Sequence, residues 1–118
     1  MRAYLPVGWA DLRTLRDAGE LAGPRRGCVV DPVWRAGGPE VDEEEWEFEA
    51  QLLAAQALPD LDGGVVLARD LDPKGLSAPV DGWLDVPGLV RRREVGALLT
   101  EDLAWFGVQE LDEVLDRR

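Results

Sequence analysis

The sequence predicts a single α/β domain, residues 1–118, in which a mixed, largely parallel sheet of about five or six strands carries helices on at least one face. From Met1 to Arg69, short apolar segments alternate with amphipathic ones, an order typical of an α/β layer with parallel neighbours. Nearly half of the residues are hydrophobic, which is enough for one core. A ferredoxin-like α+β sandwich is the alternative fold, because a β-α-β pattern opens the chain.

The N-terminal third predicts a strand, a helix and a second strand. Apolar and polar residues alternate over Met1–Leu5, and Pro6 is expected to end this strand. Apolar residues recur at a spacing of three in Trp9–Ala18, and Gly19 suits a left-handed C-cap behind that helix. The second strand is expected at Gly27–Val30, which is fully apolar, as interior strands are.

The best-defined helix is Val41–Pro59, with the sequence VDEEEWEFEAQLLAAQALP. Asp42 is expected to cap its N-terminus, and Glu45 stands at the capping-box position three residues later. The acidic first turn also compensates the positive end of the helix dipole. One broad apolar face begins at Trp46 and is expected to meet the sheet. A second apolar stripe lies roughly opposite and consists of Phe48, Leu52 and Ala55.

The second stripe predicts that this helix is covered on both sides. The preceding segment, Val33–Glu40, is expected to be a Gly/Pro loop, and its Trp34 side chain is expected to fold back onto the protein. We expect the stripe to be covered by this loop or by another chain.

The rest of the sequence predicts a turn-rich loop, four further strands and a short terminal helix. The strands are expected at Val65–Arg69, Val80–Val86, Glu94–Thr100 and Leu103–Val108, with Gly82 marking a bulge. The loop is Asp70–Pro79, a single helical turn is expected at Leu89–Arg93, and the terminal helix at Glu110–Asp116.

Composition limits the classes of protein. The net charge is −11, from 24 acidic residues against 13 Lys plus Arg, and this argues against a nucleic-acid binder, which needs a positive surface. No apolar run is long enough to cross a membrane, and the N-terminus lacks the features of a signal peptide. The single cysteine, Cys28, agrees with a reducing compartment, so a cytoplasmic location is expected.

The residue types present exclude several chemistries. Because the chain has no histidine, Ser–His–Asp and Cys–His catalysis and histidine-containing metal sites are excluded. Ser77, the only serine, has no evident base beside it, and no phosphate-binding glycine motif occurs. Cys28 would need a cationic neighbour such as Arg26 to act as a nucleophile, and a buried structural thiol is the preferred interpretation.

Three carboxylates predict the one candidate metal site. Asp31 follows the Gly27–Val30 strand, and Asp70 and Asp72 follow the Val65–Arg69 strand. In a parallel sheet these side chains would share the carboxyl edge, where they could hold Mg²⁺ for phosphoryl transfer or hydrolysis. The other interpretation is that aspartates are common where strands end in turns.

Aromatic and charged clusters predict candidate interfaces. Of five tryptophans, Trp46, Trp83 and Trp105 are expected in the core, whereas Trp9 and Trp34 are candidates for a partner interface together with Phe48 and Leu52. The acidic run Asp42–Glu49 could bind a metal or a basic partner, although helix capping explains most of it. The basic run Arg91–Arg93 could contact a phosphate or the acidic helix of another copy, or it could be a solvated turn.

Three stretches resemble a family of small uncharacterised actinobacterial proteins, classed as a domain of unknown function. They are MRAYLP at Met1–Pro6, DEEEWEFEA at Asp42–Ala50 and LAWFGVQEL at Leu103–Leu111. The resemblance implies a small cytoplasmic α/β domain and transfers no catalytic residues. It also implies an extra helix between the last two strands, where this chain has only residues 100–102, so part of one sheet face is expected to lack cover and to favour a partner.

Two functions follow from these observations. The favoured one is a non-catalytic protein-binding or regulatory module, acting on a protein partner or as a homodimer and needing no cofactor. The alternative is a metal-dependent phosphoryl-transfer or hydrolase enzyme that uses Asp31, Asp70 and Asp72.

Overall fold

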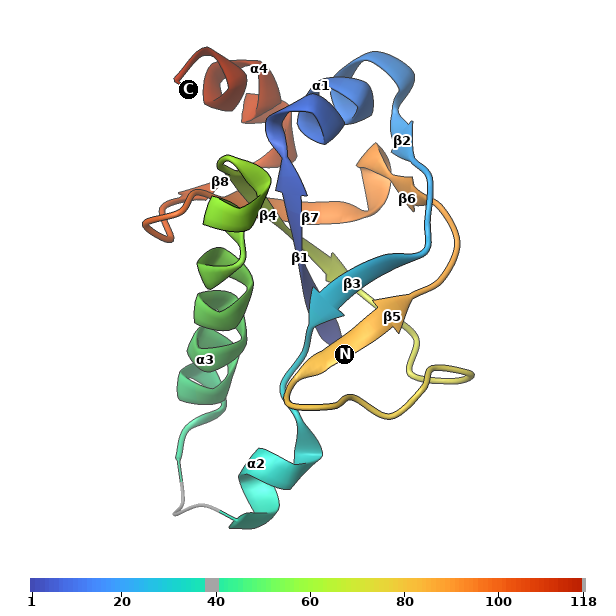
Figure 1. Cartoon of the computed structure of the whole chain (residues 1–118), viewed down its shortest axis with the longest axis vertical. Helices are drawn as coiled ribbons and strands as arrows, with labels where there is room; N and C mark the ends of the chain where they lie inside the picture. Colours follow the sequence, from blue (N-terminus) through green and yellow to red (C-terminus); the bar gives the residue numbers. More distant parts are fainter. Residues whose placement is uncertain (38–40, 118) are drawn as a thin grey trace.

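A computed structural model describes residues 1–37 and 41–117 (Figure 1). These residues form four α-helices, eight strands and three short 3-10 turns, which are joined by loops. The helices are α1 (Trp9–Ala18), α2 (Pro32–Gly37), α3 (Glu43–Gln56) and α4 (Leu111–Asp116). The strands are β1 (Arg2–Gly8), β2 (Glu20–Leu21), β3 (Arg25–Cys28), β4 (Gly64–Asp70), β5 (Trp83–Val86), β6 (Val90–Arg91), β7 (Val95–Leu99) and β8 (Trp105–Phe106). The 3-10 turns are η1 (Leu58–Leu61), η2 (Arg92–Glu94) and η3 (Val108–Glu110).

The main sheet has six strands in the order β5-β3-β1-β4-β7-β8, and every neighbouring pair is antiparallel. The expected largely parallel α/β sheet is therefore wrong. The segment β3–α3–β4 does connect two strands of the same direction, because both run antiparallel to β1. However, β1 lies between them, so no parallel pair forms. Apolar patterning cannot distinguish these arrangements, since an interior strand is apolar on both faces in either case.

The ferredoxin-like alternative does not describe the sheet either. The second strand of the predicted β-α-β unit corresponds to β3, which pairs antiparallel with β1, whereas a β-α-β unit needs two strands of the same direction. In β1, pairing with β4 continues through Pro6 to Gly8, so Pro6 does not end the strand. A proline removes only one N–H donor from the hydrogen bonds between the strands, and its φ is compatible with extended backbone.

Two cores lie on opposite faces of the main sheet. Alternate residues of β1 serve each core, with Leu5 on one face and Tyr4 on the other, and both side chains are almost fully buried. The α1-side core is covered by α1 and α4, which lie side by side at one end of the molecule (Figure 1). The α3-side core is covered by α3, which lies against β1, β3 and β4. A sheet covered on both faces explains why its central strands contain few polar residues.

A buried polar network holds α3 on the sheet. The hydroxyl of Tyr4 donates to Glu47 at 2.7 Å and accepts a hydrogen bond from Gln51 at 3.2 Å. Tyr4 and Gln51 are both buried. Because an unmade hydrogen bond in such a place is costly, this network fixes the rotation of α3 as well as its position.

The C-terminal segment is partly covered. Helix α4 forms where a terminal helix was predicted, and its apolar residues Leu111, Val114 and Leu115 are buried in the α1-side core. β8 is only two residues long, and it leaves Trp105 half exposed at the edge of the sheet. The prediction that Trp105 lies in the core is therefore wrong. None of the helices that the structure describes has the length and hydropathy needed to span a bilayer.

The burial of α4 makes it part of the folding unit. We expect Leu111→Ala to lower the free energy of unfolding by about 2–5 kcal/mol, as for other fully buried leucines. Urea unfolding followed by circular dichroism measures this. Glu113→Ala is the matched control on the same helix, because it removes only an exposed pair with Arg117 and should cost less than about 0.5 kcal/mol. Equal losses in the free energy of unfolding for the two variants would contradict the conclusion that α4 is part of the folding unit.

The Tyr4 network predicts a loss of stability at alkaline pH. Burial raises the pKa of Tyr4 from 10.0 to about 12, and the hydrogen bond to Glu47 acts in the same direction. The unfolded chain therefore loses this proton before the folded protein does, so the free energy of unfolding falls as pH rises from about 10 to 12.

We expect Tyr4→Phe to remove this contribution, on the order of 2 kcal/mol across that range. Urea unfolding at a series of pH values measures it. Cys28→Ala is the comparison, because burial raises the pKa of Cys28 from 9.0 to about 12 and this thiol does not belong to the network. It should remove a separate loss of stability that already begins near pH 9 and keep the loss that Tyr4 causes. If the free energy of unfolding of Tyr4→Phe depends on pH as that of the wild type does, the alkaline loss of stability does not come from Tyr4.

Candidate functional site

Asp31 organises the segment that follows β3. Its carboxylate is buried and accepts hydrogen bonds from the amides of Val33, at 3.0 Å, and Gly82, at 3.1 Å. Its carbonyl accepts from the amide of Trp34. With Pro32 at the first helical position, this arrangement starts α2, so the predicted loop Val33–Glu40 is wrong up to Gly37. Residues 38–40 lie outside the described residues.

Gly82 fixes the position of the Trp34 ring. It belongs to a tight turn in which Val80 and Trp83 exchange hydrogen bonds of 2.8 and 3.0 Å. Gly82 has φ +86° in this turn, which is therefore not the predicted bulge. A Cβ atom at Gly82 would lie 2.7 Å from the Trp34 ring, so a larger residue cannot fit without moving the tryptophan. The absence of a side chain at Gly82 thus makes room for Trp34.

Trp34 of α2 stacks on Trp46 of α3. The ring centroids are 6.2 Å apart and the rings are inclined by 29°. Beside them lies a pocket of about 330 Å³, which is lined by residues of both helices. We call this the tryptophan pocket. It is lined by Trp34, Val41, Glu45, Trp46 and Glu49.

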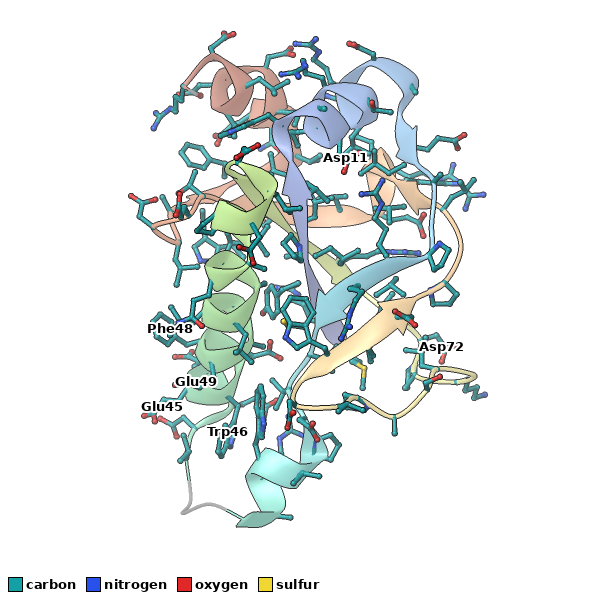
Figure 2. The ribbon with its side chains drawn as sticks, viewed as in Figure 1. Asp11, Glu45, Trp46, Phe48, Glu49 and Asp72 are labelled. Atoms are coloured by element: carbon teal, nitrogen blue, oxygen red, sulfur yellow. The ribbon has the colours of Figure 1, made fainter. Side chains whose placement is uncertain are left out.

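The acids of α3 have different roles. Asp42 occupies the N-cap position, but its carboxylate makes no capping hydrogen bond, so the predicted capping box does not form. Glu43 pairs with Arg35, and Glu47 belongs to the Tyr4 network. Figure 2 shows Glu45 and Glu49 on the outer side of α3, at the tryptophan pocket. Neither forms an ion pair with any residue of 1–37 or 41–117.

The three aspartates of the predicted metal site are not brought together. Asp31 and Asp70 do lie at one edge of the sheet, because β3 and β4 run in the same direction, but β1 separates them. Asp70 pairs with Arg2 at 3.2 Å. Asp72 is exposed, accepts from the amide of Lys74, and lies on the side away from α3 in Figure 2.

Within the described ranges, no group of three or more Asp, Glu or Cys side chains is arranged to hold a metal ion. The geometry thus gives the magnesium site no support, and that site stays a prediction from the sequence.

The predicted interface residues lie in different environments. Trp9 packs against the α1-side core and Trp34 against the α3-side core, each half-buried. On α3, Phe48 is 50% exposed and Leu52 is partly exposed, whereas Ala55 is buried. Because Trp34 stacks on Trp46, it does not cover Phe48. The prediction of a fully covered second stripe is therefore wrong for an isolated chain.

Cys28 lies in the interior. Burial raises the pKa of its thiol to about 12, and nearby Arg26 only partly offsets this shift. Arg26 instead lies over the Trp83 ring, 5.4 Å from its centroid. The thiol stays protonated near neutral pH, which agrees with a structural cysteine.

The basic run Arg91–Arg93 borders a second, shallow pocket of about 490 Å³. Gly19, Glu20 and Val108 complete its lining. Arg91 pairs with Glu94 at 3.8 Å, which reduces the positive charge of the run. This pocket lacks the aromatic walls of the tryptophan pocket.

The sequence patterns include Glu45 and Glu49 in a run that could bind a basic partner, but they do not predict that these two acids and Trp46 line one pocket. Trp46 was assigned to the core and Glu45 to a capping box. The signal that does exist is the spacing of the two acids, one helical turn apart. Helix α2 brings Trp34 next to Trp46, and the sequence patterns do not predict this helix.

The role of Asp31 is testable by substitution. We expect Asp31→Ala to lower the free energy of unfolding by about 2–4 kcal/mol, because two amides lose their acceptor and α2 loses its cap. Asp72→Ala, at an exposed position, should cost less than about 0.5 kcal/mol. Urea unfolding with and without millimolar MgCl₂ measures both. An Asp31→Ala effect that appears only with MgCl₂ would instead support the magnesium site.

Comparison with known proteins places the chain in a family. No curated protein and no solved structure matches it significantly. Of the three stretches that resemble a family of unknown function, Met1–Pro6 and Asp42–Ala50 lie inside the matched region, whereas Leu103–Leu111 lies beyond it. Residues 1–99 match the model of a family of unknown function (DUF6912), and the chain therefore belongs to that family.

Proposed function

We propose that this protein is a non-catalytic cytoplasmic module that binds a basic, amphipathic segment of another protein on the outer side of α3. The observation that carries the proposal is the exposed Phe48, which lies on the same outer side of α3 as Glu45 and Glu49 (Figure 2). Neither acid forms an ion pair with a residue that the structure describes. Leu52 extends this surface by one turn. We call Glu45, Phe48, Glu49 and Leu52 the α3 strip.

The α3 strip has the composition of a docking site. An exposed large apolar side chain is informative when it belongs to a patch with defined polar neighbours, and Phe48 is a candidate anchor because aromatic residues dominate binding energy at interfaces. The flanking carboxylates favour a positively charged partner and disfavour an acidic one.

Charge also decides between another protein and a second copy. A symmetric contact through the α3 strip would place Glu45 and Glu49 against the same residues of the partner copy. Like charges facing each other oppose such a dimer, and the net charge of −11 adds to the repulsion. A basic partner removes this penalty.

The remaining side chains support a binding role over catalysis. Cys28 is buried and protonated, Ser77 is exposed in a loop, and the chain has no histidine. The reducing environment that suits a lone buried thiol supports the cytoplasmic part of the proposal.

A labelled amphipathic helix of leucine, alanine and arginine is a suitable probe, with a glutamate-for-arginine version as its control. In fluorescence anisotropy we expect the basic peptide to bind with a Kd on the order of 10 μM and the acidic one not to bind. Phe48→Ala should weaken binding about tenfold, because a half-exposed aromatic anchor is lost. Val80→Ala removes a more exposed apolar side chain that does not belong to the α3 strip, and it should have no effect.

Light scattering of the protein alone completes the test. We expect a monomer. A dimer that Phe48→Ala dissociates would show that a second copy occupies the α3 strip, and equal affinity for the two peptides would overturn the proposed partner class.

A further inference from the structure

The geometry points to a specific subsite beside the α3 strip: the tryptophan pocket binds the guanidinium group of an arginine side chain. This inference rests on the proposed function, because the arginine would belong to the docking segment. It goes further by naming the chemical group that is recognised and the residues that recognise it.

The aromatic wall of the pocket is held in place before any ligand binds. Trp34 packs closely against Gly82 and stacks on Trp46. Its helix is tied through Asp31 to the turn that contains Gly82. Because the rings are fixed by these neighbours, a ligand would lose little affinity to ordering them.

The spacing of the rings determines where a ligand lies. A planar group between two rings needs about 7 Å, two van der Waals separations, whereas the centroids of Trp34 and Trp46 are 6.2 Å apart. A ligand therefore does not insert between the two rings and instead lies in the pocket that both rings line. Glu45 and Glu49 line that same pocket.

The electrostatics of the pocket favour a cation. The π face of tryptophan attracts positive charge, and carboxylates do so more strongly. Glu45 and Glu49 are four residues apart on α3, so their repulsion destabilises the free helix slightly. Glu43 and Glu47 of the same helix already have partners, since Glu43 pairs with Arg35 and Glu47 accepts from Tyr4, and neither lines the pocket. A bound cation would relieve the repulsion of the remaining pair.

The shape of the pocket favours arginine over lysine. A guanidinium is planar, stacks on an aromatic face and can donate two parallel hydrogen bonds to one carboxylate. A lysine ammonium is a compact, strongly hydrated charge that uses a flat aromatic wall less well. Val41, at the rim, contacts the apolar part of either side chain.

The test uses small probes with the full chain. N-acetyl-argininamide is titrated while the indole N–H signals of the tryptophans are followed by NMR, with assignment by Trp34→Phe and Trp46→Phe. We expect saturable shifts of the Trp34 and Trp46 signals with a Kd on the order of millimolar. N-acetyl-citrullinamide, the neutral isostere, should bind at least tenfold more weakly, and N-acetyl-lysinamide should lie between the two.

Substitution at the carboxylates provides the second arm. The double variant Glu45→Gln/Glu49→Gln should weaken argininamide binding roughly fivefold, the combined effect of two exposed ion pairs. Glu44→Gln removes an exposed acid of the same helix that does not line the pocket, and it should change nothing. Thermal unfolding of each variant confirms that the fold is intact.

The outcomes separate this inference from the proposed function. Equal binding of argininamide and citrullinamide, or no shift of the two indole signals, overturns the guanidinium subsite even if the basic peptide still binds at Phe48. Argininamide binding in the pocket together with failure of the peptide overturns the proposed docking strip and leaves the subsite standing.

Discussion

β1 lies between two strands that run opposite to it, and it is buried on both faces. Its two neighbours in the sheet, β3 and β4, are joined by the segment of chain that contains α2 and α3. The side chains of β1 also belong to both cores, with Leu5 under α1 and Tyr4 under α3. Since Tyr4 bonds two side chains of α3, the placement of that helix and of everything on its outer surface depends on this strand.

The sequence predicted the local elements well and their arrangement poorly. Helix α1 has the predicted bounds, with its C-cap at Gly19 in the left-handed conformation, because both features depend on neighbouring residues. The direction of β1 relative to β3 could not be predicted in this way. The apolar composition of a strand indicates that it is buried, but it does not indicate whether the neighbouring strands run parallel or antiparallel to it.

The candidate site illustrates the same limit. The sequence predicts Trp34 as a contact residue, Trp46 as a core residue and Glu45 as part of a helix cap. Each interpretation follows from the residues next to it in the chain. The pocket arises where α2 meets α3, and that meeting depends on the hydrogen bond between Asp31 and Gly82, which are far apart in sequence. Phe48 is exposed where the sequence predicts cover, and its place in an interface stays a prediction.

The short strand β8 has a consequence for behaviour at high concentration. An open sheet edge offers unpaired amides and carbonyls to other molecules, and long flat edges promote strand-to-strand aggregation. With two residues, β8 presents too little regular backbone for another strand to extend. At the opposite edge, β5 is four residues long and begins at the tight turn around Gly82. A protein that exposes an aromatic side chain on a helix can thus keep that surface accessible without its sheet polymerising.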